Sequence, residues 1–486
     1  MNPPHRPYPN AWESLAWLCL VALNGYLWLS ISDTLDWKMV HDAPIMHYIA
    51  WNILDGAVPY RDIFDMNMPG TYLIHMGVLK IFGEGDPAWR LFDIFILALT
   101  SIGMIIFCWR QGLLAGVTAA TLFACFHISG GELMVGQRDF LMTPFLIFGG
   151  HFVANIIENR QRMLYSFLAG ILFGCAIWIK PYVLILFVVL LLYAKIQSKN
   201  IFVSLLMILG FLLPVGGMFG WLYMIDGLLS WWEIFSQYLV PIYSSVGNEM
   251  TKAQMVSEML LTLAVLLPFL ALSTPLTGRF FVSLSGVIFG VIHYIIQGKG
   301  WHYHLSPLLL WASVFVSYRI GSNIKAPKTT PRFAALIGIS MTCALASPLY
   351  LLTPEKIEQK VPDQSEAIYS DLKDKIVAGD TVQVMDHTSG GIHALLKLHM
   401  KQPTRFLRDF HLYASGEKYY VQRIEDEFIH DLTEKLPKAI VLTRESWPSN
   451  NTGFDRIKNS PRLSDLLQSK YHVEIDNPEY RIYLRN

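Results

Sequence analysis

The sequence has no excess of charge of either sign, which argues against one large class of partners. Its 486 residues include 38 Lys and Arg and 38 Asp and Glu, so the formal net charge is zero. A surface that binds DNA or RNA is expected to be basic, because contacts to phosphate dominate the affinity. We therefore expect no nucleic-acid partner.

Cysteine is scarce, and its placement excludes two kinds of small stabilised domain. The chain contains five cysteines, none of them in a C-x-x-C pair and none in the polar C-terminal region. All five lie inside apolar runs, at Cys19, Cys108, Cys125, Cys175 and Cys343. We expect neither a zinc knuckle nor a disulfide framework.

Several sequence signatures are also missing. No small-residue cleavage site follows the first apolar run, so we expect this run to be a retained membrane span and not a removed signal peptide. We find no internal repeat, low-complexity tract or lipid-attachment motif. There is no glycine-rich phosphate loop in the C-terminal region, where residues 386–391 are expected to form only a turn from a strand into a helix.

Long apolar runs dominate the rest of the chain. Hydrophobic residues make up 53% of the sequence and charged residues only 16%, which is typical of a membrane protein. A spanning helix needs about 20 mostly apolar residues. We predict eleven transmembrane helices, some of them short, near 12–31, 91–109, 113–128, 140–157, 164–179, 181–194, 201–224, 255–272, 280–296, 305–320 and 333–351.

Basic residues in the connecting segments indicate the orientation of these spans. If the N-terminus, with His5 and Arg6, is cytoplasmic, every inner connection contains at least one Lys or Arg. An odd number of spans also places the C-terminal region outside. The outer face then receives residues 33–90, 129–139, 180–181, 225–253, 297–304 and everything after 352, which include nearly all the polar clusters of the membrane half.

Two outer regions are expected to have structure of their own. In the first outer loop, residues 45–54 and 71–82 are expected to form helices that lie in the membrane interface. After residue 352 the composition becomes that of a soluble α/β domain, so we divide the chain into domains 1–352 and 353–486. In the second domain we predict strands at 381–385, 439–442, 473–475 and 480–484, and helices at 392–398, 419–436 and 463–469.

The acid-rich first outer loop contains the candidate catalytic base, Asp42. A carboxylate just beyond a span can take a proton from an acceptor hydroxyl while the lipid part of a substrate stays in the bilayer. Asp-Ala-Pro also starts a helix well, so position alone favours a helix N-cap role for Asp42, and the two roles are compatible. Arg61 and Asp62, later in this loop, could contact substrate or could simply pair with each other.

Three cations on the outer face are candidates for holding a phosphate. The planar fork of Arg138 suits phosphate, although Arg138 could instead reach toward water with Asp139 as its partner. Lys180 interrupts an apolar run, where a charge is costly and usually functional, but it could also extend to the interface beside Pro181. Lys299 lies between two glycines whose backbone amides could approach the same phosphate.

His302 and His304, in the polar segment after the ninth predicted span, are also candidates for contact with the donor phosphate or substrate. They are two residues apart, which does not match the i, i+4 spacing of a helical metal pair, so a metal site is only weakly indicated. Ordinary loop histidines are the alternative. A cationic set facing an acidic loop suits an anionic lipid-phosphate donor and a neutral hydroxyl acceptor.

Taken together, these motifs resemble a known family. Asp42 followed by Tyr48, Leu-Asp-Gly at 54–56, Pro-Tyr-Arg-Asp at 59–62 and Met-Pro-Gly at 68–70 resemble its first periplasmic loop. The family is that of the bacterial GT-C glycosyltransferases that use polyprenyl-phosphate sugars, in the protein-mannosyltransferase and aminoarabinose-transferase superfamily. Three later segments of this chain also resemble landmarks of the family: Gln-Arg-Asp at 137–139, Lys-Pro at 180–181, and Gln-Gly-Lys-Gly-Trp at 297–301 with His304 and Pro307.

The resemblance covers about residues 12–350 and implies inverting transfer of a sugar from a polyprenyl-phosphate carrier. The acceptor would be a glycan, lipid or protein on the periplasmic side of the bacterial inner membrane. In this family Asp42 aligns with the loop acid taken as the base, and Arg138, Lys180 and Lys299 would hold the carrier phosphate. An acid often follows that Asp, whereas this chain has Ala43, so Asp139 is a candidate for a second carboxylate.

The resemblance carries over no metal, so we expect no cofactor and leave a divalent metal open. Two other functions compete with the glycosyltransferase. A transporter or lipid flippase with an extracytoplasmic cap domain would also have many spans and a buried lysine. The polar residues cluster at one face and not at the midplane, however, and the chain shows no paired halves. An assembly protein would confine its charge to the cap, which the acidic first loop does not fit.

Overall fold

The structure is a computed structural model that describes residues 11–156, 162–246, 251, 253–257, 260, 277–324, 363–413, 418–445, 447 and 452–486. Contacts within the chain define two compact units. Unit 1 comprises Met1–Trp37, Arg90–Gly216 and Met250–Lys360, and unit 2 comprises Lys38–Trp89, Gly217–Glu249 and Val361–Asn486. The division into domains 1–352 and 353–486 stays a prediction.

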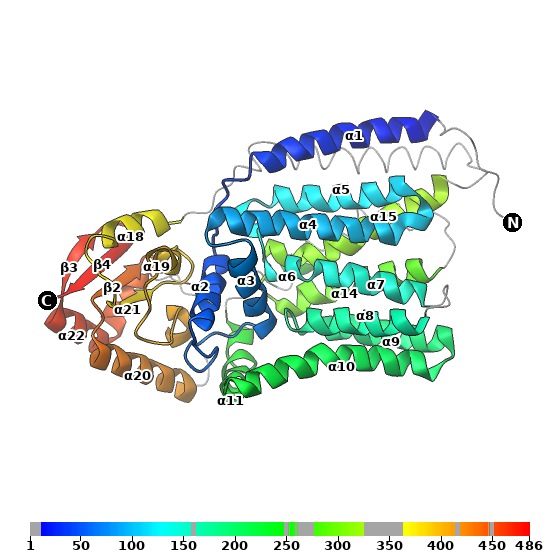
Figure 1. The fold of residues 1–486 in the computed structure, drawn as a ribbon. Helices are drawn as coiled ribbons and strands as arrows, with labels where there is room; N and C mark the ends of the chain where they lie inside the picture. Colours follow the sequence, from blue (N-terminus) through cyan, green and yellow to red (C-terminus); the bar gives the residue numbers. More distant parts are fainter. Residues whose placement is uncertain are drawn as a thin grey trace. The chain divides into compact units, whose positions relative to one another are not determined.

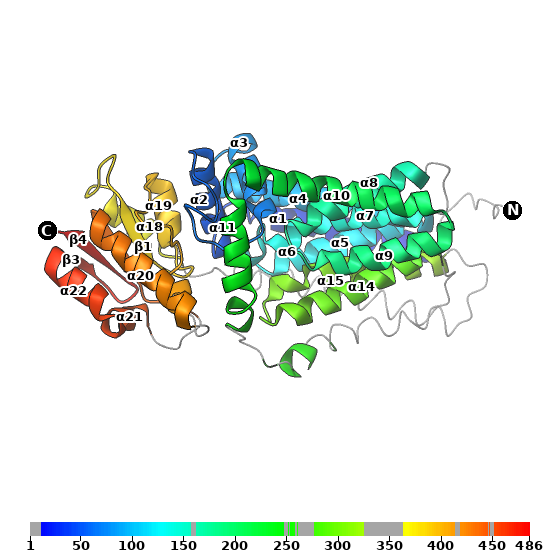
Figure 2. The same ribbon diagram turned by 90° about the horizontal axis from the view of Figure 1, so that it is seen from below.

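Long apolar helices make up the membrane half of the chain (Figures 1 and 2). Nine of the eleven predicted spans coincide with described helices, and the other two, 255–272 and 333–351, lie largely or wholly outside the described residues. The matching helices are α1 (Ala11–Ser32), α4 (Asp86–Cys108), α5 (Leu113–Ser129), α7 (Thr143–Asn155), α8 (Arg162–Ile177), α9 (Val183–Ser198), α10 (Ile201–Met224), α14 (Gly278–Gln297) and α15 (Ser306–Ile324).

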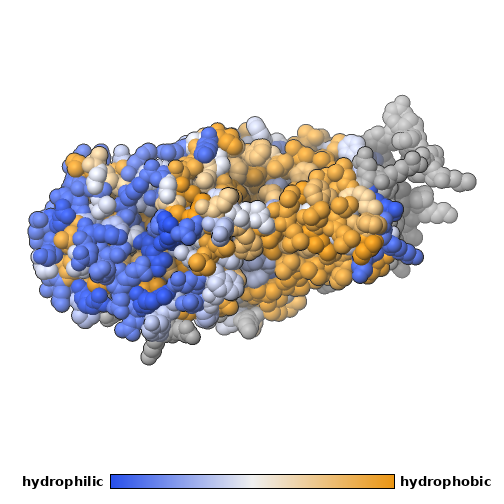
Figure 3. All heavy atoms as spheres, turned by 60° about the horizontal axis from the view of Figure 1, so that its bottom comes forward, coloured by the Kyte–Doolittle hydropathy of each residue, from blue (hydrophilic) through white to orange (hydrophobic). Residues whose placement is uncertain are grey.

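Length and composition allow three segments of the described chain to cross a membrane, namely Asp86–Gln111, Ile201–Met224 and Gly278–Gln297. Four shorter apolar helices accompany them. In the view of Figure 3, apolar side chains cover the face of this helical region. Leu192 on α9 and Leu205 and Leu213 on α10 expose 51–60% of their surface, which suits contact with lipid. The total of eleven spans stays a prediction.

Small residues let two of these helices approach closely. A Cβ atom on Gly170 of α8 would lie 2.1 Å from the carbonyl oxygen of Met207, and one on Gly210 of α10 would lie 2.2 Å from that of Phe167. Without a hydrophobic driving force between helices in lipid, such backbone contact is a main source of packing energy.

Short elements connect the helices of unit 1 at its polar segments. They are η1 (Trp109–Gln111), η2 (Glu132–Met134), α6 (Arg138–Leu141) and η5 (His302–Leu305). The helix α14 ends at Gly298, which adopts a left-handed conformation with φ 67°. Gly300 also has a positive φ, 73°, so the backbone turns sharply on both sides of Lys299.

Unit 2 combines the first long loop with the C-terminal region. The loop forms α2 (Asp42–Leu54) and α3 (Pro69–Ile81), which pack on each other and confirm the two predicted helices of this loop. Residues of the middle segment form α11 (Leu228–Glu233), the π-helical turn η3 (Ile234–Leu239) and η4 (Tyr243–Ser245).

The C-terminal region is an α/β layer built around a four-stranded sheet of order β1-β2-β4-β3. The strands β1 and β2 are parallel, with Val382 opposite Ala439, and the other two pairs are antiparallel. All four predicted strands and all three predicted helices are present. The elements are α18 (Ser365–Leu372), β1 (Val382–Met385), α19 (Gly391–Leu398), η6 (Asp409–Tyr413), α20 (Lys418–Lys435), β2 (Ala439–Thr443), α21 (Gly453–Asn459), α22 (Pro461–Lys470), β3 (Tyr471–Asp476) and β4 (Tyr480–Arg485).

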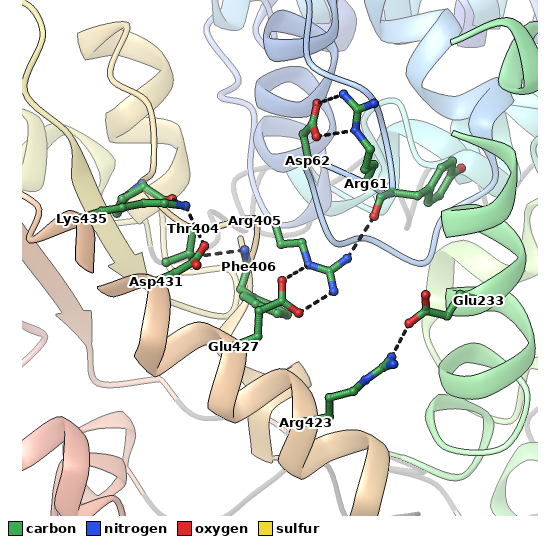
Figure 4. A network of polar contacts seen from close by, with 12 residues as sticks. Arg61, Asp62, Glu233, Thr404, Arg405, Phe406, Arg423, Glu427, Asp431 and Lys435 are labelled. Atoms are coloured by element: carbon green, nitrogen blue, oxygen red, sulfur yellow. Dashed lines mark hydrogen bonds and ion pairs between the residues drawn. The ribbon is translucent and has the colours of Figure 1, made fainter. Parts of the chain in front are cut away.

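The segment after α19 joins the C-terminal region to the first loop. The Tyr48 hydroxyl on α2 donates to the Met400 carbonyl at 3.0 Å and accepts from the Gln402 amide at 2.9 Å. The Phe64 amide donates to the Arg405 carbonyl at 2.7 Å. Figure 4 shows the Arg405 guanidinium paired with Glu427 of α20 and donating to a loop carbonyl. The loop and the C-terminal region therefore form one folded body.

We expect Gly210→Leu to destabilise the protein, because the side chain has to displace the backbone of α8. Overpacking of this kind costs about 1–3 kcal/mol. Thermal unfolding in detergent measures the effect, with Gly216→Leu on the same helix as the control, because a Cβ there meets nothing within 4 Å. Equal melting temperatures for the two variants would contradict the close approach of α8 and α10.

Candidate active site

Asp42 forms a buried ion pair with Arg408, a residue 366 positions away in the C-terminal region. The exposed fraction is 4% for Asp42 and 3% for Arg408. A guanidinium nitrogen of Arg408 donates to Oδ1 of Asp42, and Nδ1 of His41 lies 3.5 Å from the same oxygen. Charges so far from water are stable only when they compensate each other.

The backbone at this point is unusual. His41 has φ 59° and ψ −117°, a combination that residues with a side chain rarely adopt and that often marks functional sites. His41 is the N-cap of α2, and Asp42 is the first residue inside the helix. The alternative that Asp42 is the N-cap is therefore wrong. Its carboxylate bonds to Arg408, while the Ala43 amide is taken by the Val40 carbonyl.

Neutral aromatic groups surround the pair. Burial, together with the positive charge of Arg408, lowers the pKa of both His387 and His411 well below the usual range. His387 stacks on Trp447 with 5.0 Å between ring centroids, and Nδ1 of His411 lies 2.8 Å from the Tyr238 hydroxyl. With both histidines neutral at pH 7, Asp42 carries the negative charge that compensates Arg408.

Arg61 and Asp62 pair with each other, which was the alternative to contact with substrate. Two nitrogens of the Arg61 guanidinium donate to the Asp62 carboxylate at 2.8 and 3.0 Å (Figure 4). A third contact reaches Asp226 at 3.3 Å. Asp62 also accepts the Val58 amide at 2.8 Å. Hydrogen bonds from Arg61 lower the pKa of Asp62 despite its partial burial. Both side chains are over one-third exposed, and substrate binding by them stays a prediction.

A second polar cluster, in unit 1, is centred on Asp139, which is fully buried. His293 Nε2 and Gln297 Nε2 donate to its Oδ1 at 2.6 and 3.0 Å, and Lys180 Nζ lies 3.2 Å from Oδ2. The Lys180 ammonium also donates to Gln297 Oε1 at 2.6 Å. Burial would raise the pKa of Asp139, but Lys180 and the histidines outweigh it and hold this pKa well below its usual range.

Local structure explains how these groups meet. His293 and Gln297 are four residues apart on α14 and so lie on one face of the helix. Lys180 occupies the short connection between α8 and α9, where the following proline keeps it out of helical angles. Asp139 is in the first turn of the short helix α6.

Three more predicted residues of unit 1, Lys299, His302 and His304, differ in their exposure to solvent. Lys299 and His304 are buried, with 5% and 2% exposure, and the charges of Asp139 and Arg138 both act on His304. Burial is the main reason that the pKa of His304 is lowered well below its usual value. His302 is exposed on the same short helix, so the structure gives no support for pairing the two histidines on one ligand.

A third buried group, which the sequence analysis missed, supports the segment before Asp139. Asp93 of α4 accepts the Gly136 amide at 2.7 Å, lies 3.0 Å from His127 and pairs with Arg90. Arg90 in turn donates to the Thr34 carbonyl at 3.2 Å. Arg90 and Asp93 lie three residues apart in an apolar helix, and such charged residues can be recognised in the sequence. His293 could be found in the same way, whereas nothing in the sequence points to Arg408.

Within the described residues, no group of three or more His, Cys, Asp and Glu side chains is arranged to hold a metal ion. One cluster presents a carboxylate paired with a guanidinium, and the other presents Lys180 beside a buried carboxylate.

Comparison with solved structures identifies the fold. ArnT from Cupriavidus metallidurans, solved with bound undecaprenyl phosphate, matches 96% of this chain and 97% of its own with 11% identity and a TM-score of 0.62. The archaeal oligosaccharyltransferase AglB from Archaeoglobus fulgidus, in complex with an inhibitory peptide and a dolichol-phosphate, matches 97% of this chain and 74% of its own, with 11% identity and a TM-score of 0.51.

The fold is therefore the GT-C fold, as the sequence resemblance implied. Likeness at this identity concerns the fold and not the activity. No protein-family model matches the chain. A search of curated proteins also finds no match.

We expect Asp93→Asn to destabilise unit 1, because it leaves the buried Arg90 without a compensating charge. Removing one partner of a buried pair costs about 3–5 kcal/mol. Thermal unfolding in detergent measures the loss. The control is Asp226→Asn, an exposed partner of Arg61, for which about 0–1 kcal/mol is expected. A loss for Asp93→Asn as small as the control's would contradict a supporting role for the Asp93 group.

Proposed function

We propose that this protein is an integral-membrane glycosyltransferase that moves a sugar from a polyprenyl-phosphate donor to a hydroxyl of a cell-envelope acceptor. The observation that carries the proposal is the likeness over 96% of the chain to a structure with bound undecaprenyl phosphate. The Lys180 ammonium beside Asp139 supports it, because a cation is the group that an anionic donor needs.

In the proposed reaction Asp42 is the general base. It takes the proton of the acceptor hydroxyl as the hydroxyl oxygen attacks the anomeric carbon of the donor sugar. The bond from that carbon to the phosphate oxygen breaks, and the polyprenyl phosphate leaves with the bonding electrons. Attack opposite the leaving group inverts the anomeric configuration. The phosphate needs no proton, because it is a good anionic leaving group when cations stabilise it.

Lys180, Arg138 and Lys299 are the proposed cations. Lys180 is partly buried and already pairs with one oxyanion, the fully buried carboxylate of Asp139. A phosphate oxygen offers the same kind of acceptor with more charge, so it can compete for or share this ammonium group. Asp139, held ionised by its neighbours, then limits the net positive charge that the segment carries without donor.

The proposed location is the bacterial inner membrane. The apolar helices fit insertion into a bilayer. The basic residues of the alternate connections favour a cytoplasmic N-terminus and a periplasmic C-terminal region. In this proposal the donor sugar is a hexose or pentose, and the acceptor is a glycan, lipid or protein.

We expect Asp42→Asn to abolish transfer, with a loss of at least about 10²-fold in kcat, because the amide cannot accept the proton. Isolated membranes supplied with a labelled polyprenyl-phosphate sugar and cell-envelope acceptor measure the activity. Asp55→Asn, an exposed acid of the same loop that pairs with Lys401, is the control and should retain activity. Full activity of Asp42→Asn would exclude Asp42 as the base.

We also expect Lys180→Ala and Lys299→Ala to raise the KM for the donor by about tenfold or more, because each loses a charge-assisted bond to phosphate. The KM for the acceptor should change little. Lys195→Ala, an exposed lysine near the end of α9, is the control. An unchanged donor KM in both variants would remove these lysines from the phosphate site.

A further inference from the structure

Arg408 is the feature of this protein that the proposed reaction does not yet use. It belongs to the C-terminal region, yet its guanidinium contacts the carboxylate of Asp42 in the first loop. The two side chains are almost completely buried. A capping domain that only shielded the membrane half would have no reason to insert a permanent charge beside the base.

The backbone around Arg408 is held on both sides. Before it, the Arg405 carbonyl accepts the Phe64 amide, and the rings of Phe64 and Phe406 lie 5.3 Å apart. After it, the Asp409 amide donates to the Asp386 carbonyl at the end of β1 at 3.3 Å. These contacts attach the segment to both the loop and the sheet, so they hold in place the backbone from which the Arg408 side chain extends.

We propose that Arg408 is a positioning residue for the general base: its ion pair keeps the Asp42 carboxylate ionised and fixes its orientation toward the acceptor hydroxyl. This inference rests on the proposed glycosyltransferase function. It makes the C-terminal region part of the catalytic apparatus, because the base is complete only when that region is folded against the first loop.

The charge of Arg408 is permanent, and this sets it apart from the histidines nearby. Arginine stays protonated at any physiological pH, and its planar fork constrains a carboxylate more than the point charge of lysine does. The titratable and charged groups that act on this region come from several elements. They are His41 beside Asp42, Asp65 in the loop, Tyr238 of η3, Asp386, His387 and Glu445 after the parallel strands, Asp409 and His411 of η6, and Arg456 of α21.

The pH dependence of kcat separates positioning from a purely structural role. An adjacent guanidinium favours the ionised form of a carboxylic acid and typically lowers its pKa by about 1–3 units. Without Arg408 the carboxylate of Asp42 should become protonated at a higher pH. The acid limb of the plot of kcat against pH should therefore move to higher pH. A residue that only stabilised the fold would change the amount of active enzyme and leave the position of this limb unchanged.

The experiment compares Arg408→Gln, Arg408→Lys and wild type in the transfer assay over a range of pH. For Arg408→Gln we expect kcat to fall about tenfold or more, the donor KM to stay within about twofold, and the acid limb to move up by about one pH unit or more. For Arg408→Lys we expect the wild-type acid limb and an intermediate kcat, because the charge returns without the fork.

The matched control is Arg423→Gln, which removes an exposed ion pair of the same region with Glu233 (Figure 4). It should behave as wild type. A wild-type kcat and pH profile for Arg408→Gln, with Asp42→Asn inactive, would overturn the positioning role and leave the glycosyltransferase proposal standing. If Arg408→Gln does not fold, Arg408→Lys decides, and a full kcat in that variant would overturn the role. Absence of transfer by wild type would instead overturn the proposed function.

Discussion

The structure depends on one constraint: a charge taken out of water must be compensated by a partner held in place. Asp42 satisfies it with Arg408, and Asp139 does so with Lys180 and His293. The energetic cost of leaving any of these groups alone is large, so the surrounding backbone has to present the partners accurately. That requirement brings together segments that are far apart in the sequence, and it produces the two polar clusters on which the proposed chemistry rests.

The sequence predicted most of the fold because the signals are local. A span is recognised from about 20 apolar residues, and the strands and helices of the C-terminal region from short apolar runs between turns. The cluster in unit 1 was partly predicted for the same reason. Lys180 interrupts an apolar run, Asp139 lies at the mouth of a span, and a charge in either place needs a functional or structural explanation.

The rest of the candidate site depends on contacts that leave no local trace. Arg408 pairs with a residue 366 positions away, and nothing in its own neighbourhood distinguishes it from other cations of a soluble domain. The N-cap of α2 is His41, and the Asp42 carboxylate accepts a hydrogen bond from this distant arginine. His302 and His304 show a similar limit, because only the turn of η5 decides that one is exposed and the other buried.

The fold is shared with membrane glycosyltransferases, and we propose that its two polar clusters act as a base and as a phosphate site. On this proposal the chain consumes a polyprenyl-phosphate sugar. The most direct measurement is mass spectrometry of the lipid carrier and of the cell-envelope glycans from cells with and without the gene. We expect deletion to remove one sugar from a single envelope glycan, glycolipid or glycoprotein while the polyprenyl-phosphate-linked form of that sugar accumulates. Unchanged glycans and an unchanged carrier pool would contradict it.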